Sequence, residues 1–218
     1  MTFMCRRSLL FRIPSLLGLL LWGSSALADV AGLQQEWAHI MYQLPADARE
    51  EAMAALADRA GQEVAANPED PELLIWRGIV LSTYAGEKGG LGALGLAKEA
   101  RASLEQALKL DETALQGSAY TSLGSLYYKV PGWPIGFGSD KKAREYLERA
   151  LALNPEGIDP NFFMGEFLYE QGEYQDAMRH LQTALRAPDR PGRLVADQGR
   201  RQEIRELVQK LDGRLAAR

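Results

Sequence analysis

Three segments of this 218-residue chain repeat one pattern of small and large apolar residues. They read AKEARASLEQALKLDE, KKAREYLERALALNPE and YQDAMRHLQTALRAPD, and each has an alanine, a leucine four positions later and an alanine three positions after that. In an α-helix these three positions lie on one face. Each segment follows a helix-compatible stretch with a central glycine, namely Gly78, Gly124 or Gly165. The pattern predicts three helix pairs in which a glycine of the first helix allows close approach of the second.

Helix-breaking residues separate the predicted pairs. Joints rich in proline, asparagine, aspartate and glycine occupy residues 67–72, 154–160 and 187–192, and a shorter joint occupies residues 111–113. From residue 31 onward the apolar residues recur at helical spacing, and no stretch alternates apolar and polar residues as a half-buried strand would. The sequence therefore predicts an all-α chain.

The repeated unit resembles the tetratricopeptide repeat, a 34-residue helix pair with a small residue in its first helix and alanines in its second. Gly165 and Ala177 have the family's 12-residue spacing, and Pro155 stands at its terminal proline position. The spacing from Gly78 to Ala100 is about ten residues longer, and that from Gly124 to Ala143 about seven longer. We expect the extra residues of both spacings to lie at the turn between the two helices of a pair, where they do not change how the pairs stack. The resemblance implies an α-α superhelix of about three pairs.

The predicted repeats cover residues 69–189 and are flanked by capping helices. Residues 29–68 read as a degenerate repeat at the N-terminal end, and residues 190–218 as a C-terminal cap whose apolar residues share one face, since a last repeat needs covering. The joint before this cap is rich in arginine and contains Asp189, Asp197 and Glu203. We expect these carboxylates to pair with the arginines and to pin the cap, in preference to an acidic partner.

The first 28 residues have the features of a cleavable signal peptide. A basic region with Arg6, Arg7 and Arg12 precedes a short apolar run, and small residues end at Ala28, where we expect cleavage. The apolar run is short for a bilayer span, so an uncleaved anchor is the second interpretation. The paired arginines leave export by the general or by the twin-arginine route open. The leader predicts a periplasmic protein.

Charge and cysteine content exclude several classes of partner and chemistry. Removal of the leader takes three arginines and no acid, so the net charge changes from −4 to −7. This balance argues against a nucleic acid or an anionic membrane as partner, because both select a basic face. Membrane attachment is expected only through an uncleaved leader. Cys5 is the only cysteine, so the mature chain has no thiol chemistry or disulfide.

No motif for catalysis, cofactors or metals has its required context. Gly90-x-Gly92-x-x-Gly95 matches the dinucleotide fingerprint, but a helix precedes it where the fold needs a strand, so we interpret it as a turn between helices. The glycines of residues 132–138 lack the lysine of a phosphate loop. His39 and His180 each stand without a second ligand. The sequence predicts no enzyme, no cofactor and no metal site.

Aromatic residues gather on the predicted first helices and in one insert. First helices of such solenoids line the concave surface, where a peptide or partner protein is held. The candidate partner-binding residues on these elements are Tyr120, Tyr128, Trp133, Phe137, Asn161 and Glu166. We therefore predict a non-catalytic scaffold that binds a protein or peptide partner on its concave face.

The insert and the repeat after it carry a narrower resemblance. The stretch VPGWPIGFGSDKKAREYLERAL followed by NPEGIDPNFFMGEFLYEQGEY is similar to the periplasmic helical-repeat component of tripartite (TRAP-type) solute transporters. That resemblance implies an alternative function as an accessory component that holds an apolar small ligand. The component is usually a lipoprotein, and this chain has no cysteine after the predicted cleavage point. Within the insert, we expect Ser139 or Asp140 to cap the following helix.

Overall fold

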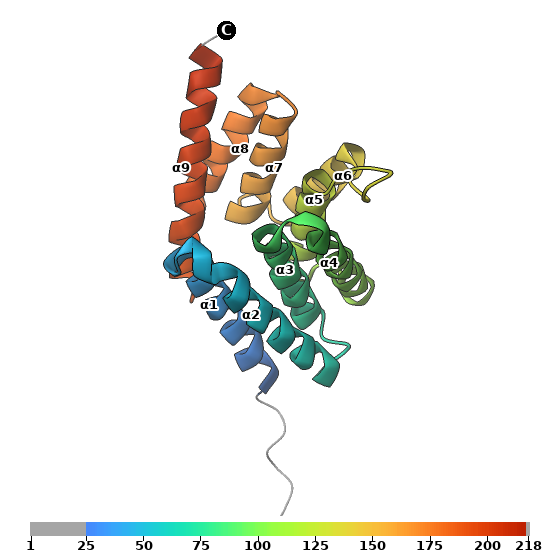
Figure 1. Cartoon of the computed structure of the whole chain (residues 1–218). Coiled ribbons are helices and arrows are strands. Elements are labelled where there is room, and N and C mark those ends of the chain that lie inside the picture. The colour runs from blue at the N-terminus through green and yellow to red at the C-terminus, as the bar shows by residue number, and fades with distance from the viewer. Residues whose placement is uncertain (1–24, 217–218) are drawn as a thin grey trace, which may run out of the picture.

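The computed structural model describes residues 25–216, and within this range the chain forms nine α-helices and no β-strand (Figure 1). They are α1 (Ser25–Gln43), α2 (Ala46–Ala66), α3 (Pro71–Lys88), α4 (Gly90–Leu110), α5 (Ser118–Lys129), α6 (Asp140–Leu153), α7 (Ile158–Glu170), α8 (Tyr174–Arg186) and α9 (Leu194–Ala216). A short 3-10 helix, η1 (Ala114–Gln116), precedes α5. Consecutive helices pack as pairs, which confirms the predicted all-α superhelix. The predicted leader lies, up to residue 24, outside the described residues, and its cleavage stays a prediction.

The repeated glycines and leucines meet within each helix pair. A Cβ added at the glycine would lie only 2.5 Å (Gly78 and Leu104), 2.6 Å (Gly124 and Leu147) or 2.8 Å (Gly165 and Leu181) from the leucine side chain. The alanines on either side of these leucines have no exposed surface. Such close packing between two helices needs a residue without a side chain at the contact. The glycines, leucines and alanines of the repeated pattern thus form the core of the stack.

Capping residues start the helices where the joints predict. Asp70 precedes α3, and its carboxylate accepts hydrogen bonds from the backbone N–H groups of Glu72 and Leu73 at 2.9 and 3.1 Å. Ser139 precedes α6, and its hydroxyl accepts from the N–H of Lys142 at 3.4 Å. These side chains satisfy N–H groups that lack a partner inside the helix. Ser139 is therefore the predicted cap.

The first of the two excess spacings is not a loop, which corrects the prediction for the glycine-rich segment. Helix α3 runs to Lys88, and α4 begins at Gly90, so that the Gly90-x-Gly92-x-x-Gly95 pattern forms the first turns of α4. Only Gly89 and Gly90 turn the chain, with φ of 61° and 59° in the region that favours glycine. The excess lengthens both helices of the pair. This is possible because the intervening alanines and leucines are good helix formers.

The second excess is a loop, as predicted. Residues 130–139 connect α5 to α6, and their Phe137 ring packs edge-on against Tyr127 with centroids 5.4 Å apart. The loop stands out from the stack beside α6 (Figure 1). It therefore adds a protrusion to the middle pair without changing how the pairs stack.

The last helix contacts both the stack and the first helix. Ile204, Leu207 and Leu211 of α9 are buried, and α9 packs against α7 and α8 as a cap should. Helix α9 also packs against α1, near the other end of the chain (Figure 1). At this α1–α9 contact, a Cβ added at Gly199 would lie 2.2 Å from Cδ1 of Tyr42. The two ends of the solenoid thus meet.

Candidate functional site

The α1–α9 contact closes a cavity of about 780 Å³ on the side of the stack formed by the first helices. Its walls come from α1, α3, η1, α5, the N-terminal end of α7, the joint of residues 187–193 and the N-terminal half of α9. The size lies within the range of about 300–1,000 Å³ that is usual for ligand sites. This cavity is the candidate functional site.

One wall of the cavity is aromatic. Trp37 of α1 packs edge-on against Trp76 of α3, with ring centroids 6.1 Å apart, and against Tyr42 at 5.8 Å. The Trp37 indole N–H donates to Oγ1 of Thr83 at 2.9 Å, so this ring is held in place by a polar contact as well. Phe163 of α7 also lines the cavity. Fixed aromatic rings offer a large apolar contact area at little cost in conformational entropy.

A second wall carries hydroxyls and an unusual turn. Ser118, Ser122 and Ser125 on the first turns of α5 line the cavity. Just before them, Leu115 and Gln116 both have positive φ, of 47° and 56°, and both line the cavity. Consecutive non-glycine residues in this region are uncommon and carry strain, which often marks a binding site. The hydroxyls provide hydrogen-bonding groups beside the aromatic wall.

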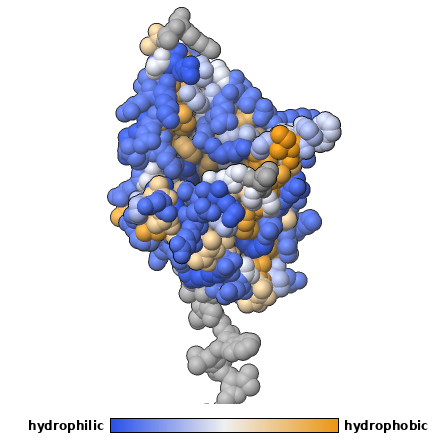
Figure 2. Space-filling view, in the orientation of Figure 1, coloured by the Kyte–Doolittle hydropathy of each residue, from blue (hydrophilic) through white to orange (hydrophobic). Residues whose placement is uncertain are grey.

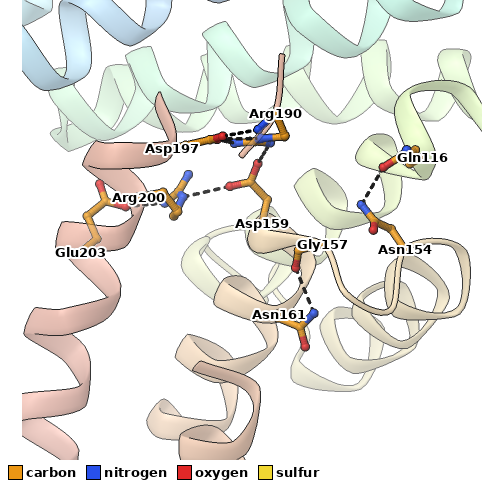
Figure 3. A network of polar contacts seen from close by, with 9 residues as sticks. All are labelled: Gln116, Asn154, Gly157, Asp159, Asn161, Arg190, Asp197, Arg200 and Glu203. Carbon is orange, nitrogen blue, oxygen red and sulfur yellow. Dashed lines mark hydrogen bonds and ion pairs between the residues drawn. The ribbon is translucent and has the colours of Figure 1, made fainter. Parts of the chain in front are cut away.

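A third wall is built from ion pairs between α7, the last joint and α9 (Figure 3). Asp159 accepts from Arg190 at 2.6 Å and from Nε of Arg200 at 2.9 Å. Arg190 also donates through Nε to the fully buried Asp197 at 2.7 Å, and Arg200 pairs with Glu203 at 2.5 Å. Burial alone would raise the pKa of Asp159, but the Arg190 and Arg200 charges outweigh it and hold that pKa well below its usual range. These ion pairs confirm the prediction that the arginines of the last joint pair with carboxylates of the chain itself. We call the ion pairs among Asp159, Arg190, Asp197, Arg200 and Glu203 the lock.

The lock includes Asp159, which the sequence analysis did not assign to it. Asp159 belongs to α7 and joins two arginines that belong to the joint and to α9. Arg201 pairs with Asp189 at 2.7 Å, as predicted. The lock therefore fastens the C-terminal cap to the last repeat as well as to its own joint.

Arg193 is the cavity arginine outside this lock. Its guanidinium stacks over Trp76 at 4.9 Å from the ring centroid, and no ion pair joins it to a carboxylate among the described residues. Its buried Nε and the buried indole N–H of Trp76 both lack an acceptor within that part of the chain. Burial and then the Arg190 charge lower the pKa of Arg193. This corner of the cavity therefore has donor capacity that the protein itself does not use.

The tyrosine of the α1–α9 contact is enclosed by charged groups. Burial is the largest cause that raises the pKa of Tyr42 well above its usual range, although the Arg200 charge acts in the opposite direction. Tyr42 lines the cavity and lies directly on Gly199. Its neutral phenol is thus part of what joins the two ends of the chain.

The structure places the six predicted partner-binding residues outside the cavity lining. Tyr128 and Glu166 come together, because the Tyr128 hydroxyl donates to Oε2 of Glu166 at 2.7 Å. The Glu166 carboxylate also pairs with Lys129 at 2.9 Å. Trp133 is 90% exposed on the loop of residues 130–139, and Phe137 is half-buried in the same loop. Of these four residues, Tyr128 and Glu166 are thus engaged with each other, and Trp133 is the most exposed.

The other two predicted residues have structural roles. Asn161 is 2% exposed, and its amide donates to the carbonyls of Pro155 and Gly157 at 2.8 and 2.9 Å, which fixes the joint before α7 (Figure 3). Tyr120 is 8% exposed, and its hydroxyl donates to Glu112 at 2.8 Å. Their burial removes both from the surface that a partner can reach, so the structure gives them a different role from the predicted one.

Sequence reasoning missed the cavity because its lining joins residues of the repeats to residues of the two flanking segments. Trp37 and Tyr42 belong to the first capping helix, and Arg193 to the last joint. A usable signal was present in Trp37 and Trp76, two of the chain's four tryptophans, which stand on the first helix of the N-terminal cap and on the first helix of the first repeat. Among residues 25–216, no cluster of three metal-ligating side chains and no helix long and apolar enough to cross a bilayer occurs.

The helix pairs, their glycine–leucine contacts and the capping helix give the chain a helical-repeat fold like that of the tetratricopeptide repeat. Residues 141–196 match the sequence model of the tetratricopeptide repeat, and this range holds α6, α7, α8 and the start of α9. The match confirms the repeat register in the part of the chain that carries the unmodified spacing. Tetratricopeptide folds generally serve as scaffolds for interaction between proteins.

Solved structures show the same fold. The chain is similar to TTC0263, a thermophilic TPR protein of Thermus thermophilus, with 22% identity, 84% of this chain and 87% of that chain covered, and a TM-score of 0.54. Two structures of MamA are more distant, each at 20% identity, with TM-scores of 0.43 and 0.45 over 84% and 82% of this chain and 91% and 100% of theirs. No curated protein matches the chain in sequence. The similarity to TTC0263 establishes the fold.

Proposed function

We propose that the chain is a non-catalytic binding protein of the periplasm, which holds a short segment of a partner protein in the cavity closed by the α1–α9 contact. The observation that carries this proposal is the composition of the cavity wall. Rigid aromatic rings, serine hydroxyls and the cation Arg193, which has no ion pair among the described residues, face one space of about 780 Å³. A catalytic role would need a nucleophile or acid–base pair, and the lining carboxylates of Asp159, Asp189 and Glu203 are engaged by arginines.

Each wall matches one part of a peptide. The Trp37 and Trp76 rings suit an apolar or aromatic side chain, and the α5 hydroxyls suit backbone N–H and C=O groups. The guanidinium of Arg193 suits a carboxylate, because planar donors pair with carboxylates in a bidentate manner. The expected segment therefore combines a large apolar side chain with an acidic side chain or a free C-terminus.

The periplasmic location rests on the leader of residues 1–28. Its basic region, short apolar run and small residues before Asp29 support export and cleavage. N-terminal sequencing of the protein recovered from the periplasm tests the location, and recovery only in the cytoplasm would contradict it.

Blocking the cavity tests the binding proposal. Ser122→Trp places a large ring in the cavity, while Gln182→Trp adds the same ring at an exposed position of α8, away from the cavity. We expect the wild type and Gln182→Trp to retain one stoichiometric protein from periplasmic extract, and Ser122→Trp to lose it. Circular dichroism checks that both variants keep their helicity. Equal retention by both variants would contradict the proposal.

The cavity size favours one alternative, an accessory ligand-binding protein for a solute transporter. A volume of about 780 Å³ with an aromatic wall also suits a small apolar ligand. Native mass spectrometry of the protein from periplasm separates the two functions. A bound small molecule that Ser122→Trp excludes would support the alternative, whereas a bound polypeptide supports the first proposal.

A further inference from the structure

The loop of residues 130–139 presents two large apolar side chains to solvent. Trp133 is 90% and Ile135 69% exposed, more than any other large apolar residue in the described part of the chain. In Figures 1 and 2 this loop projects beyond the outline of the helices, with hydrophobic residues at its base. Exposed apolar groups gathered at a protrusion usually mark an interaction site.

The exposure is imposed by the structure of the loop. The backbone N–H groups of Ile135 and Gly136 both donate to the carbonyl of Gly132 at 3.1 Å, and that of Gly138 donates to Pro131 at 3.0 Å. The N–H of Ser139 donates to the carbonyl of Tyr127 at 2.8 Å, which ties the loop to α5. These bonds fix the backbone of the loop on either side of Trp133, whose side chain is 90% exposed.

One aromatic side chain of the loop anchors it while the other points away. Phe137 lies between the Tyr127 ring, 5.4 Å away, and the Arg101 guanidinium, 4.4 Å from its centroid. A Cβ at Gly136 would lie 3.4 Å from Cδ1 of Leu94, so the base of the loop rests on the N-terminal half of α4. The base of the loop is thus packed against the helices through Phe137 and Gly136, and its tip extends into solvent.

Cationic side chains flank the tip. Lys129 lies directly before the loop, and Lys141 and Lys142 lie directly after it, with Asp140 as the one acid of residues 129–142. The Lys141 and Lys142 residues are exposed; the first pairs weakly with Glu145 at 4.0 Å, and the second lies over the Tyr127 ring. Lys129 pairs with Glu166 at 2.9 Å, so Lys142 is the one lysine of the three without an ion pair among the described residues, and the loop combines an exposed tryptophan and isoleucine with this cation.

We propose that this loop inserts its tip into the interface of a lipid bilayer that contains anionic lipids. Tryptophan favours the boundary between headgroups and hydrocarbon, and lysines beside it attract anionic headgroups. Insertion leaves few polar groups unsatisfied, because four loop N–H groups are bonded internally and Pro131 and Pro134 have none.

This attachment departs from the expectation, drawn from the net charge of the chain, that an anionic membrane is not a partner, because that expectation takes no account of where the charges lie. At physiological salt the charges interact over only about 8 Å, so the lysines next to the inserted tip dominate over distant acids. The residues of the loop do not line the cavity. Membrane contact is therefore independent of what the cavity binds, and it would place a bound partner near the bilayer.

The test measures binding of the full chain to vesicles. Wild type and Trp133→Ser/Ile135→Ser are mixed with phosphatidylcholine vesicles containing about 30% phosphatidylglycerol and sedimented. Leu110→Ser/Leu194→Ser is the matched control, because it removes two apolar side chains that are 45% and 58% exposed elsewhere on the surface. All proteins carry the same N-terminus, so any contribution of the leader is equal in each.

We expect the loop variant to bind at least about tenfold more weakly than the wild type and the control to bind like the wild type. Lys141→Glu/Lys142→Glu should also reduce binding, and wild-type binding should fall on vesicles without phosphatidylglycerol. The shift of tryptophan emission to shorter wavelength with vesicles should be smaller in the loop variant than in the wild type, because Trp37 and Trp76 are already buried at 7% and 3% exposure and Trp22 is common to both proteins. Equal sedimentation of wild type and loop variant, or a loop that binds only a protein, would overturn the proposal.

Discussion

The helix pairs and the α1–α9 contact are held together by different kinds of interaction. Within the pairs, glycine lies against leucine and alanines without exposed surface fill the remaining space. At the α1–α9 contact and the adjoining lock, arginines and carboxylates surround one partly buried tyrosine, Tyr42. Apolar packing depends on shape alone, whereas ion pairs depend on protonation and on the presence of every partner. We therefore expect the two regions to fail under different perturbations.

The largest expected effect is overpacking of a helix pair. Gly165→Leu forces a side chain into a site where a Cβ alone would lie 2.8 Å from Leu181, and we expect it to destabilise the protein by about 3 kcal/mol or more. Gly61→Leu on α2 is the control, because a Cβ there meets nothing within 4 Å. Urea denaturation followed by circular dichroism measures both. A neutral result for Gly165→Leu would show that the repeat register is wrong.

Removal of the Asp159 carboxylate, at the centre of the lock, should destabilise the α1–α9 contact and leave the helix pairs unchanged. Asp159→Asn leaves Arg190 and Arg200 without their shared partner, and we expect a loss of about 2 kcal/mol. Asp176→Asn, which breaks an exposed pair with Arg179, should cost at most about 0.5 kcal/mol. Hydrogen exchange locates the effect: faster exchange in α9 with α5 and α6 unchanged is expected. Equal acceleration in all helices would mean that the two regions are not separable.

Two glycines of α9, Gly199 at the α1–α9 contact and Gly213 outside it, test how tightly this contact is packed. Gly199→Ala directs a methyl group toward Tyr42 and should cost about 1–2 kcal/mol despite the better helix propensity of alanine. Gly213→Ala, with nothing within 4 Å of the added Cβ, should stabilise α9 by up to about 1 kcal/mol. Thermal melts of the two variants should therefore shift in opposite directions. Shifts of the same sign would argue against a tight α1–α9 contact.

The smallest effect concerns pH. The lowered pKa of Asp159 means that its contribution is complete above about pH 4 and is lost as the pH falls toward the native value. The raised pKa of Tyr42 means that its contribution is complete below about pH 10 and is lost as the pH rises further. The rate of hydrogen exchange of the α9 backbone amides, corrected for the intrinsic pH dependence, should be constant between these two pH limits. It should increase below the lower limit and above the upper limit. Asp159→Asn should abolish the acid limb alone.

The sequence predicts the stack well because its determinants are local and repeated. The Ala-Leu-Ala triplets, the central glycines and the capping residues Asp70 and Ser139 each act within one or two helices. The first excess spacing was harder to interpret, because glycine-rich sequence suggests a turn while the alanines and leucines between the glycines allow a helix. Only packing against the partner helix decides between the two.

The cavity could not be predicted because it joins residues from distant parts of the chain. Tyr42 and Gly199 meet only after the curvature of four helix pairs has accumulated, and no local pattern records that curvature. Asp159 reads as an ordinary acid of a helix start, yet it is the centre of the lock. Trp133, a predicted partner-binding residue, is 90% exposed on its loop and does not line the cavity.

The meeting of α1 with α9 also has a consequence for how the chain is made. In an open repeat array each end can fray by itself and folding can spread from any unit. Here the first helix finds its final neighbour only when the last residues of the chain are available, and this long-range contact comes with a large loop-closure entropy. A chain that is translocated from its N-terminus would therefore hold an assembled stack with an exposed Trp37 and Tyr42 until α9 arrives. Completion of synthesis, and not the folding of any single repeat, would close the cavity.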